Sequence, residues 1–221
     1  MKPFLGLPEP VLSLGNPDHV ECLRTPYKRV VEFLGHAFPL EWERRQLDSM
    51  RAVMEKKYLF FESREDSRHK KEVLALLSEV VKTWSYQVAL KEKQPEMVAS
   101  RIQAKLFTFG SYYLNVDTSD GDIDMVCVVP KLFKKEEHFF KDLYELLRNN
   151  SKTKYIQQVT GAKVPILKME FDQIQIDISF AQLDAQTIDD DLDLTNNNVL
   201  INMDENSCRS LNGRRVADRI L

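Results

Sequence analysis

The sequence predicts an α+β fold, in which a small mixed β-sheet packs against helices and an N-terminal helical extension comes first. Three observations support this fold class. In the first part of the chain, apolar residues recur every three or four positions, the spacing of amphipathic helices. From residue 104 the pattern changes to short apolar runs separated by turn residues, as in strands. Two aspartates stand at the head of one of these runs, an arrangement that indicates a functional site.

Composition and charge set broad limits on the protein. The chain has 221 residues, 43% hydrophobic and 29% charged, which suits a globular protein with a sizeable core. A net charge of -3 gives no indication of nucleic-acid binding, so any such contact must come from local basic patches or from parts outside this chain. Its three cysteines are far apart and form neither a zinc spacing nor a disulfide framework, which favours a reducing compartment. No apolar run is long enough to cross a membrane, so we expect no membrane partner.

Helices are predicted in the first half of the chain. Residues 24–37 and 40–57 have helical spacing, after a turn-rich arm over residues 1–20. The clearest helix follows Ser63-Arg-Glu-Asp66, which has the form of a capping box. Its apolar stripe consists of Val73, Leu77, Val80, Val81, Trp84 and Val88. Lysines lie mainly off this stripe, and we expect them to form a solvated face: Lys70, Lys71, Lys82 and Lys91.

Strands and two further helices are predicted after residue 104. The strand-like runs are 105–109, 123–129, 156–159, 164–171 and 174–180. Because only Asp172 and Gln173 separate the last two runs, these should form a hairpin. Residues 136–148 and 207–221 have helical patterns.

The two aspartates, Asp122 and Asp124, stand at the head of an apolar strand and should point to the same face. A third, Asp177, is centred between two isoleucines that should face the core. Carboxylates are rarely buried without a compensating cation, and such oxygen ligands suit magnesium. A single aspartate here would more simply be a turn residue or the partner of a lysine. The matching aspartates on two strands favour a metal site.

The turn Gly110-Ser111 lies between the first two predicted strands. Glycine lets the backbone approach a phosphate closely, and amides at the start of a helical turn point towards an anion. Alone, Gly-Ser is equally compatible with an ordinary strand-to-helix turn. Its distance from the aspartate pair makes a phosphate cradle the better interpretation.

These features together resemble a known family. Gly-Ser followed by Asp-Ile-Asp, with a later aspartate, is similar to the nucleotidyltransferase superfamily that includes DNA polymerase beta. Further segments, covering about residue 60 to the end, resemble the eukaryotic nuclear poly(A) polymerases. They are Phe107-Thr-Phe-Gly-Ser-Tyr112, Val164-Pro-Ile-Leu-Lys168, Ile174-Gln-Ile-Asp-Ile-Ser-Phe-Ala181, Gln186-Thr-Ile188, Asp191-Leu-Asp-Leu194 and Arg209-Ser-Leu-Asn-Gly213.

The resemblance implies a nucleotidyltransferase fold and the transfer of AMP from ATP to the 3′ hydroxyl of RNA, as in mRNA polyadenylation. It implies Mg²⁺, with Mn²⁺ able to substitute, a nuclear location, and the mRNA 3′-end cleavage and polyadenylation factors as partners. Asp122 and Asp124 would bind both ions, and Asp177 would help bind the catalytic ion and activate the primer hydroxyl.

For nucleotide binding, the resemblance implies that Phe109, Gly110 and Ser111 line the nucleotide and its triphosphate. Asn212 would contact the ATP sugar. The role of Lys168 stays open between packing and the substrate channel.

The chain also departs from the family. Tyr113 stands where a basic residue is usual, and the following loop carries Asp117 and Asp120, which raises the question of whether this loop contacts phosphate or RNA. The resemblance divides the chain into an extension at 1–58, a catalytic domain at 59–205 and the start of a middle domain at 206–221. We therefore expect a catalytic-domain fragment, weakly active or inactive alone.

Two other functions remain open at this stage. Another terminal nucleotidyltransferase, uridylyl-adding or tRNA CCA-adding, would use the same carboxylates. A scaffold relative without catalysis is the alternative outside the enzymes, although intact metal ligands argue against it.

Overall fold

The computed structural model describes residues 41–57, 64–118 and 120–221. The chain forms two compact units, one of residues 1–61 with residue 221 and one of residues 62–220. In the first unit the structure describes helix α2, Glu41–Lys57, which confirms the helix predicted for 40–57. The arm at 1–20, the helix predicted at 24–37 and the first residue of the capping box lie outside the described residues.

The second unit is built on a five-stranded mixed sheet with the order β1-β2-β5-β4-β3. Its central strands β2 and β5 run parallel, and the other neighbours are antiparallel. The strands are β1 (Lys105–Phe109), β2 (Ile123–Val129), β3 (Thr153–Val159), β4 (Ile166–Phe171) and β5 (Ile174–Gln182). The predicted hairpin between β4 and β5 is confirmed, and its two turn residues both have positive φ, at 49° and 71°, as a type I′ turn requires.

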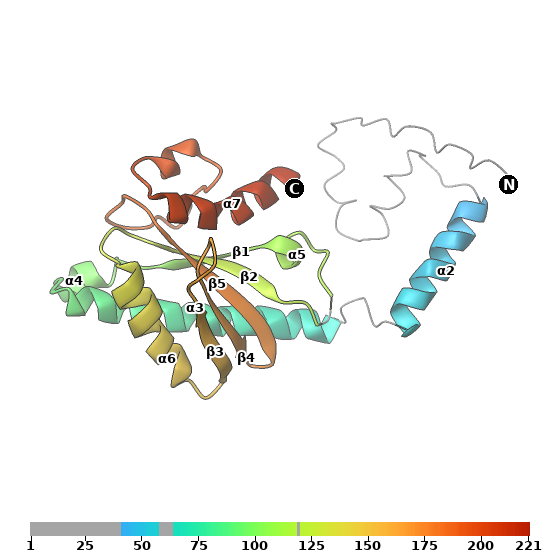
Figure 1. Cartoon of the computed structure of the whole chain (residues 1–221), viewed down its shortest axis with the longest axis horizontal. Coiled ribbons are helices and arrows are strands. Elements are labelled where there is room, and N and C mark those ends of the chain that lie inside the picture. Colours follow the sequence, from blue (N-terminus) through green and yellow to red (C-terminus); the bar gives the residue numbers. More distant parts are fainter. Residues whose placement is uncertain (1–40, 58–63, 119) are drawn as a thin grey trace. The chain divides into compact units, whose positions relative to one another are not determined.

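Helices cover both faces of this sheet. In chain order they are α3 (Arg64–Lys91), α4 (Glu96–Ala99), α5 (Gly110–Tyr113), the π-helix η3 (Lys135–Leu143), α6 (Tyr144–Arg148), the short 3-10 helix η4 (Asn197–Leu200) and α7 (Glu205–Ile220). Figure 1 shows α3 and α7 on opposite sides of the sheet. The segment predicted as one helix at 136–148 is helical, but its first part has the wider π geometry.

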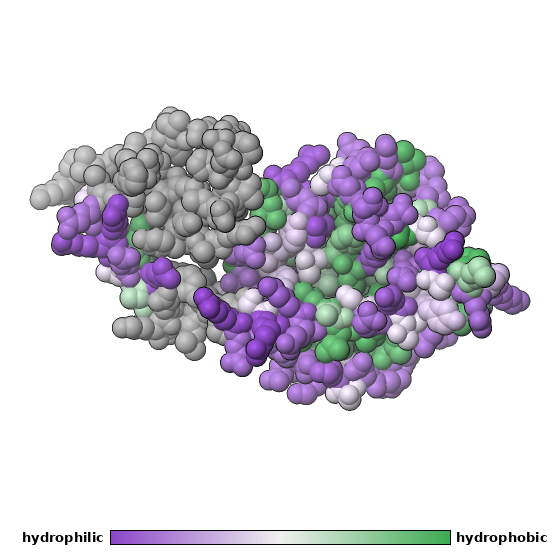
Figure 2. Space-filling model, turned by 180° about the vertical axis from the view of Figure 1, so that it is seen from behind, coloured by the Kyte–Doolittle hydropathy of each residue, from purple (hydrophilic) through white to green (hydrophobic). Residues whose placement is uncertain are grey.

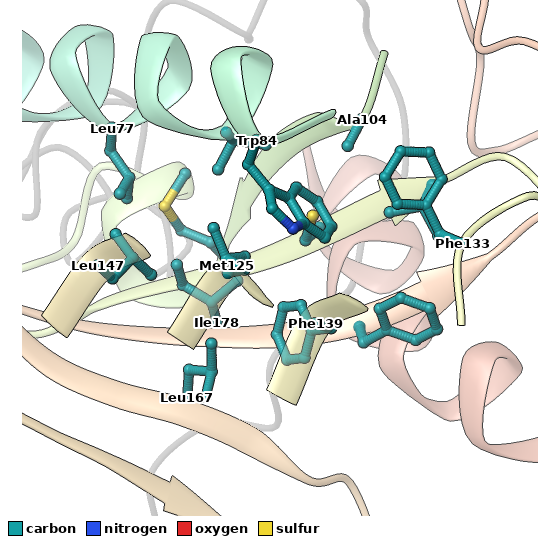
Figure 3. Close-up of a cluster of buried hydrophobic side chains, with 14 of the residues drawn as sticks. Leu77, Trp84, Ala104, Met125, Phe133, Phe139, Leu147, Leu167 and Ile178 are labelled. Carbon is teal, nitrogen blue, oxygen red and sulfur yellow. The ribbon is translucent and has the colours of Figure 1, made fainter. Parts of the chain in front are cut away.

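The larger core lies between the sheet and α3, η3 and α6. The apolar stripe of α3 meets the sheet here, as the sequence predicts: Leu77 and Trp84 face Met125 and Ile178 (Figure 3). Burying each such side chain contributes about 1.5 to 3 kcal/mol. The indole nitrogen of Trp84 donates a hydrogen bond to the carbonyl of His138, 3.1 Å away, so that its polar atom is satisfied.

A smaller core lies on the opposite face, under α7. Val126 and Val128 of β2 and Ala181 of β5 pack there against Leu211 of α7. These sheet residues belong to the second halves of β2 and β5. The first halves of the same strands on this face carry Asp124 and Asp177, which are only partly buried.

The surface of the described residues is mixed. Exposed hydrophobic side chains include Leu76, Leu90 and Met97. Seen from behind, hydrophobic patches lie among hydrophilic side chains (Figure 2). Among the helices that the structure describes, none has the length and apolarity needed to cross a membrane.

Candidate active site

The strand registers place a row of functional side chains across one face of the sheet. Phe109 of β1 pairs with Asp124 of β2, which pairs with Asp177 of β5, which in turn pairs with Lys168 of β4. Directly paired residues project from the same face of a sheet. Four predicted site residues, distant in sequence, are therefore neighbours in space.

The alternation of the strands separates this row from the core. The residues beside the two aspartates point to the α3 side and are at most 2% exposed: Ile123, Met125, Ile176 and Ile178. The prediction that the isoleucines flanking Asp177 face the core is confirmed. Asp122 directly precedes β2 and is exposed. The core on one face thus fixes the strands that hold the carboxylates on the other.

Gly110 lies so close to Asp124 that any larger residue would be strained there. Its φ is +67°, in the left-handed region, and a Cβ built on it would lie 2.4 Å from Oδ2 of Asp124. Gly110 begins α5, and Ser111 in the first turn is half-buried. The turn between β1 and α5 therefore lies directly against the aspartates.

Helix α7 forms the opposite wall of the site. Gly213 packs against the ring of Phe109, since a Cβ at Gly213 would lie 2.6 Å from ring carbons. Between α7 and the sheet is a cavity of about 270 Å³. It is lined by Phe109, Asp124, Met125, Val164, Ile166, Asp177, Ser179, Arg209, Ser210 and Gly213. Asn212 is exposed on α7 beside this wall and is not among the residues that line the cavity.

Charge is concentrated at this cavity. Partial burial raises the pKa of Asp124, and the nearby charges of Asp122 and Asp177 raise it further, against the opposing effect of Lys168. A raised carboxyl pKa means that ionisation at this position is unfavourable without a cation. The shift thus indicates that the three aspartates act on one another electrostatically.

Lys168 supplies part of the missing positive charge. Its Nζ donates to both carboxylate oxygens of Asp177, at 3.0 and 3.1 Å. This hydrogen bond is the main cause that raises the pKa of Lys168, so the ammonium form is favoured. One ammonium group faces three carboxylates, and the remaining negative charge suits a hard divalent cation with oxygen ligands. The donor set therefore fits such an ion.

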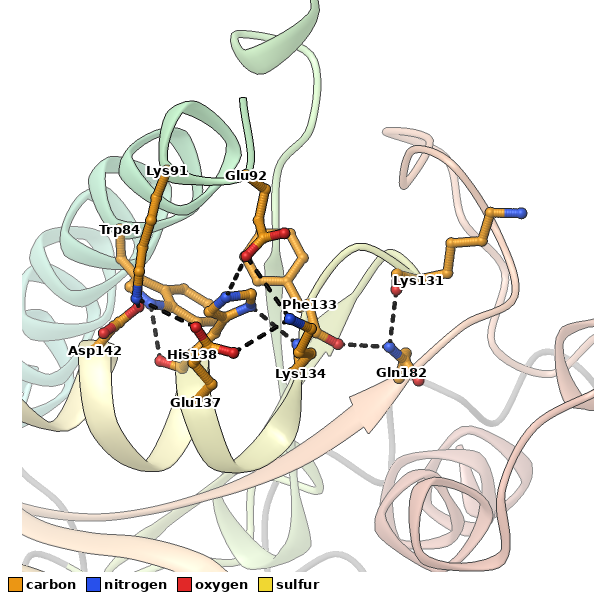
Figure 4. Close-up of polar contacts among 10 residues, drawn as sticks. All are labelled: Trp84, Lys91, Glu92, Lys131, Phe133, Lys134, Glu137, His138, Asp142 and Gln182. Carbon is orange, nitrogen blue, oxygen red and sulfur yellow. Dashed lines mark hydrogen bonds and ion pairs between the residues drawn. The ribbon is translucent and has the colours of Figure 1, made fainter. Parts of the chain in front are cut away.

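A tighter group of metal-ligand atoms occurs elsewhere. Among the residues that the structure describes, the group with three such atoms within 4.8 Å of one another is Glu92, Glu137 and His138 (Figure 4). The amide of Lys134 donates to Nδ1 of His138 at 3.0 Å, which leaves the proton on Nε2, the atom that would have to bind the ion. The Lys134 ammonium also lies 3.2 Å from Glu137. This group is better explained as an ion-pair network than as a metal site.

A further residue that positions the site was not predicted. Lys70 of α3 was expected on a solvated face, and that prediction is wrong: its side chain is fully buried. Its Nζ donates to Asp117 at 2.7 Å and to the carbonyl of Thr118 at 2.9 Å. This ion pair anchors the loop that leads into Asp122. The sequence held a clue, because Lys70 precedes Val73 by three positions and so continues the apolar stripe.

Sheet order, paired aspartates and the adjoining glycine turn define a nucleotidyltransferase-type domain. Comparison with known proteins identifies the family to which this domain belongs. The chain belongs to the family of the poly(A) polymerase nucleotidyltransferase domain, whose family model matches residues 32–221. This family uses divalent metal ions, in agreement with the donor set of the aspartates.

Two curated relatives agree with this assignment. A poly(A) polymerase of Dictyostelium discoideum is 43% identical over 162 residues, which is 73% of this chain and 20% of that protein. The nuclear poly(A) polymerase 2 of Arabidopsis thaliana is 38% identical over 161 residues, again 73% of this chain and 20% of that protein. The solved polymerase core of TRAMP, an RNA surveillance complex, matches with a TM-score of 0.39 at 25% identity, over 55% of this chain and 33% of that one. The chain thus spans about a fifth of the length of these two curated relatives.

Proposed function

We propose that the protein containing this domain transfers AMP from ATP to the 3′ hydroxyl of RNA without a template. The observation that carries the proposal is the pairing of Asp124 with Asp177 on adjacent parallel strands, beside a turn whose positive φ and close approach to Asp124 favour glycine. The names of the relatives support poly(A) addition. Because the chain spans about a fifth of their length, the activity is proposed for the whole protein.

In this proposal Asp122, Asp124 and Asp177 hold Mg²⁺, which Mn²⁺ can replace. The bound ions would supply positive charge for the attacking oxygen and for the departing pyrophosphate. The 3′ oxygen of RNA forms a bond to the α-phosphorus of ATP while the bond to the pyrophosphate oxygen breaks. Asp177 would accept the proton of the hydroxyl, and the Lys168 ammonium that donates to its carboxylate would help to hold it in position.

The nucleotide would lie between the sheet and α7. Phe109 forms one wall of the cavity, and Gly110 and Ser111 would accommodate the triphosphate. Asn212 would contact the sugar of ATP from the exposed side of α7. Lys168 is assigned to the substrate side because it lies in the row of the aspartates and partly neutralises them.

Location and partners extend the same proposal. A nuclear site of action is supported by the Arabidopsis relative, which is named as nuclear. Polyadenylation there would bring the protein together with the mRNA 3′-end cleavage and polyadenylation factors. The division into an extension at 1–58, a catalytic domain at 59–205 and the start of a middle domain at 206–221 is proposed on the same resemblance.

The test is nucleotide incorporation by the natural full-length protein onto an oligo(A) primer, with each nucleotide in turn and with Mg²⁺ or Mn²⁺. We expect ATP to be used and Asp124→Ala to lower the rate by at least about 100-fold. Glu145→Gln is the control, because this exposed carboxylate pairs with Arg148 at the surface of α6, away from the aspartates. Wild-type activity in Asp124→Ala would contradict the mechanism.

The same assay separates the alternatives. Preference for UTP would indicate a uridylyl transferase, and addition to tRNA ends of CTP and ATP would indicate a CCA-adding enzyme. Calorimetry with Mn²⁺ tests the scaffold alternative, since a protein that binds no metal even with ATP present cannot use the aspartates as proposed.

A further inference from the structure

The segment that carries Gly110 and Ser111 is not stable as a helix by itself. Helix α5 has only four residues, too few for a stable helix in isolation. Its position must be fixed by neighbouring elements. Besides β1 and β2, helix α7 contributes to this through two contacts, one before α5 and one at its end.

The first contact is hydrophobic. The ring of Phe109, directly before α5, lies against Gly213 with no room for a Cβ between them. The second contact is polar and involves the next residue along α7, Arg214. Its Nη2 donates to the hydroxyl of Tyr113, the last residue of α5, at 2.9 Å. Residues adjacent on α7 therefore hold both ends of the segment.

The polar contact is a closed network. The hydroxyl of Tyr113 donates to Asp218 at 2.7 Å, and Nε of Arg214 donates to the same carboxylate at 2.9 and 3.0 Å. The remaining Nη1 of Arg214 donates to the carbonyl of Thr108 in β1 at 3.0 Å. The guanidinium carbon also lies 3.8 Å from the centroid of the Tyr113 ring, in cation–π contact. One arginine thus joins β1, α5 and α7.

The network does not include Asp122, Asp124 or Asp177. Arg214 and Asp218 line a separate cavity of about 210 Å³ beside Leu192 and Leu194, and neither lines the cavity that contains Asp124. The charge of Arg214 is also matched by Asp218. Arg214 is therefore suited to position α5 and not to bind phosphate directly.

We propose that Arg214, Tyr113 and Asp218 form a strut that fixes the Gly110–Ser111 turn relative to the α7 wall and so sets the affinity for the nucleotide. This inference rests on the proposed function, because it assigns the triphosphate to that turn. It also accounts for Tyr113, which stands where a basic residue is usual in the family, because Arg214 of α7 contributes the basic group beside this turn. The three residues are positioning residues, since the reacting atoms lie at the aspartates.

The test uses Tyr113→Phe and Arg214→Lys in the natural full-length protein. Tyr113→Phe removes two hydrogen bonds to charged groups, and Arg214→Lys keeps the charge but loses the three-way geometry. We expect the KM for ATP to rise about five- to thirty-fold, with kcat changed less and Mn²⁺ affinity unchanged. The controls are Tyr155→Phe, at a tyrosine 84% exposed, and Arg219→Lys on the exposed side of α7.

Hydrogen exchange separates the strut from the proposed function. The amides that report on α5 are those of Leu114 and Val116, which donate to the carbonyls of Gly110 and Ser111. They should exchange faster in both strut variants, with the amides of β2 unchanged, whether or not ATP is the substrate. Unchanged exchange at α5 would overturn the strut, and faster exchange with an unchanged KM would overturn its role in nucleotide binding. If the wild type transfers no nucleotide, the proposed function fails and the exchange measurement still decides whether the strut exists.

Discussion

Replacing Gly110 by alanine should damage the site through one added methyl group. The backbone at Gly110 has φ +67°, where a residue with a Cβ is less stable by about 1 to 2 kcal/mol. The new Cβ would also lie 2.4 Å from Oδ2 of Asp124, far inside contact distance. Relieving such an overlap in a packed site costs about 1 to 3 kcal/mol. Together the two costs amount to about 2 to 5 kcal/mol. Part of this cost should appear as lower stability of the fold, and part should be relieved by displacement of the Asp124 carboxylate.

Thermal unfolding and Mn²⁺ titration of the same variant measure both parts. For a unit of this size, a loss of this order lowers Tm by about 5 to 15 °C, and the displaced carboxylate should weaken Mn²⁺ binding. Gly161→Ala is the matched control, because nothing lies within 4 Å of a Cβ built there and its φ is not in the left-handed region. Unchanged Tm and unchanged Mn²⁺ affinity in Gly110→Ala would refute the close approach between the turn and Asp124.

Three further substitutions test the surroundings. Because the pKa of Asp124 is raised in the folded protein, ionisation of this carboxyl lowers the free energy of unfolding once the pH exceeds the pKa of an ordinary aspartate. Asp124→Asn should therefore raise Tm at pH 7 without metal. This gain in Tm should disappear in acid. Lys70→Met leaves a carboxylate without its buried partner and should cost about 3 to 5 kcal/mol by urea unfolding, whereas the exposed Lys71→Met should cost little. Gly213→Ala should gain about 1 kcal/mol from helix propensity alone, but its contact with Phe109 should reverse that gain and raise the KM for nucleotide.

Much of the fold could be predicted from the sequence because the local patterns agree with the final structure. The stripe of α3 meets the sheet as expected, and the two-residue link at Asp172 and Gln173 forms the predicted hairpin. The isoleucines beside Asp177 face the core. In each case a period of two or 3.6 residues determines which side chains are buried, and this period is visible in the sequence.

The parts that could not be predicted depend on partners distant in sequence. Lys70 is buried only because Asp117, 47 positions later, meets it. Arg214 was not singled out, since its bonds to Thr108 and Tyr113 span more than 100 positions. The π geometry of η3 was not predicted either. Three consecutive residues of this helix, beginning with His138, are buried, whereas an amphipathic α-helix buries one stripe of residues three or four positions apart. No local pattern specifies such pairings.

One face of the sheet stabilises the fold, and the other carries the residues of the candidate site. Met125 and its alternating neighbours stabilise β2 and β5 from the α3 side, so the opposite face can carry Asp124 and Asp177 at close quarters despite the unfavourable ionisation of Asp124. Removing the charge of Asp124 should therefore leave the fold intact or make it more stable, while catalysis is lost. Truncation on the α3 side, as in Met125→Ala, should instead cost about 2 to 5 kcal/mol and affect function only through unfolding. A site built this way is fixed in position by side chains packed on the opposite face of the sheet.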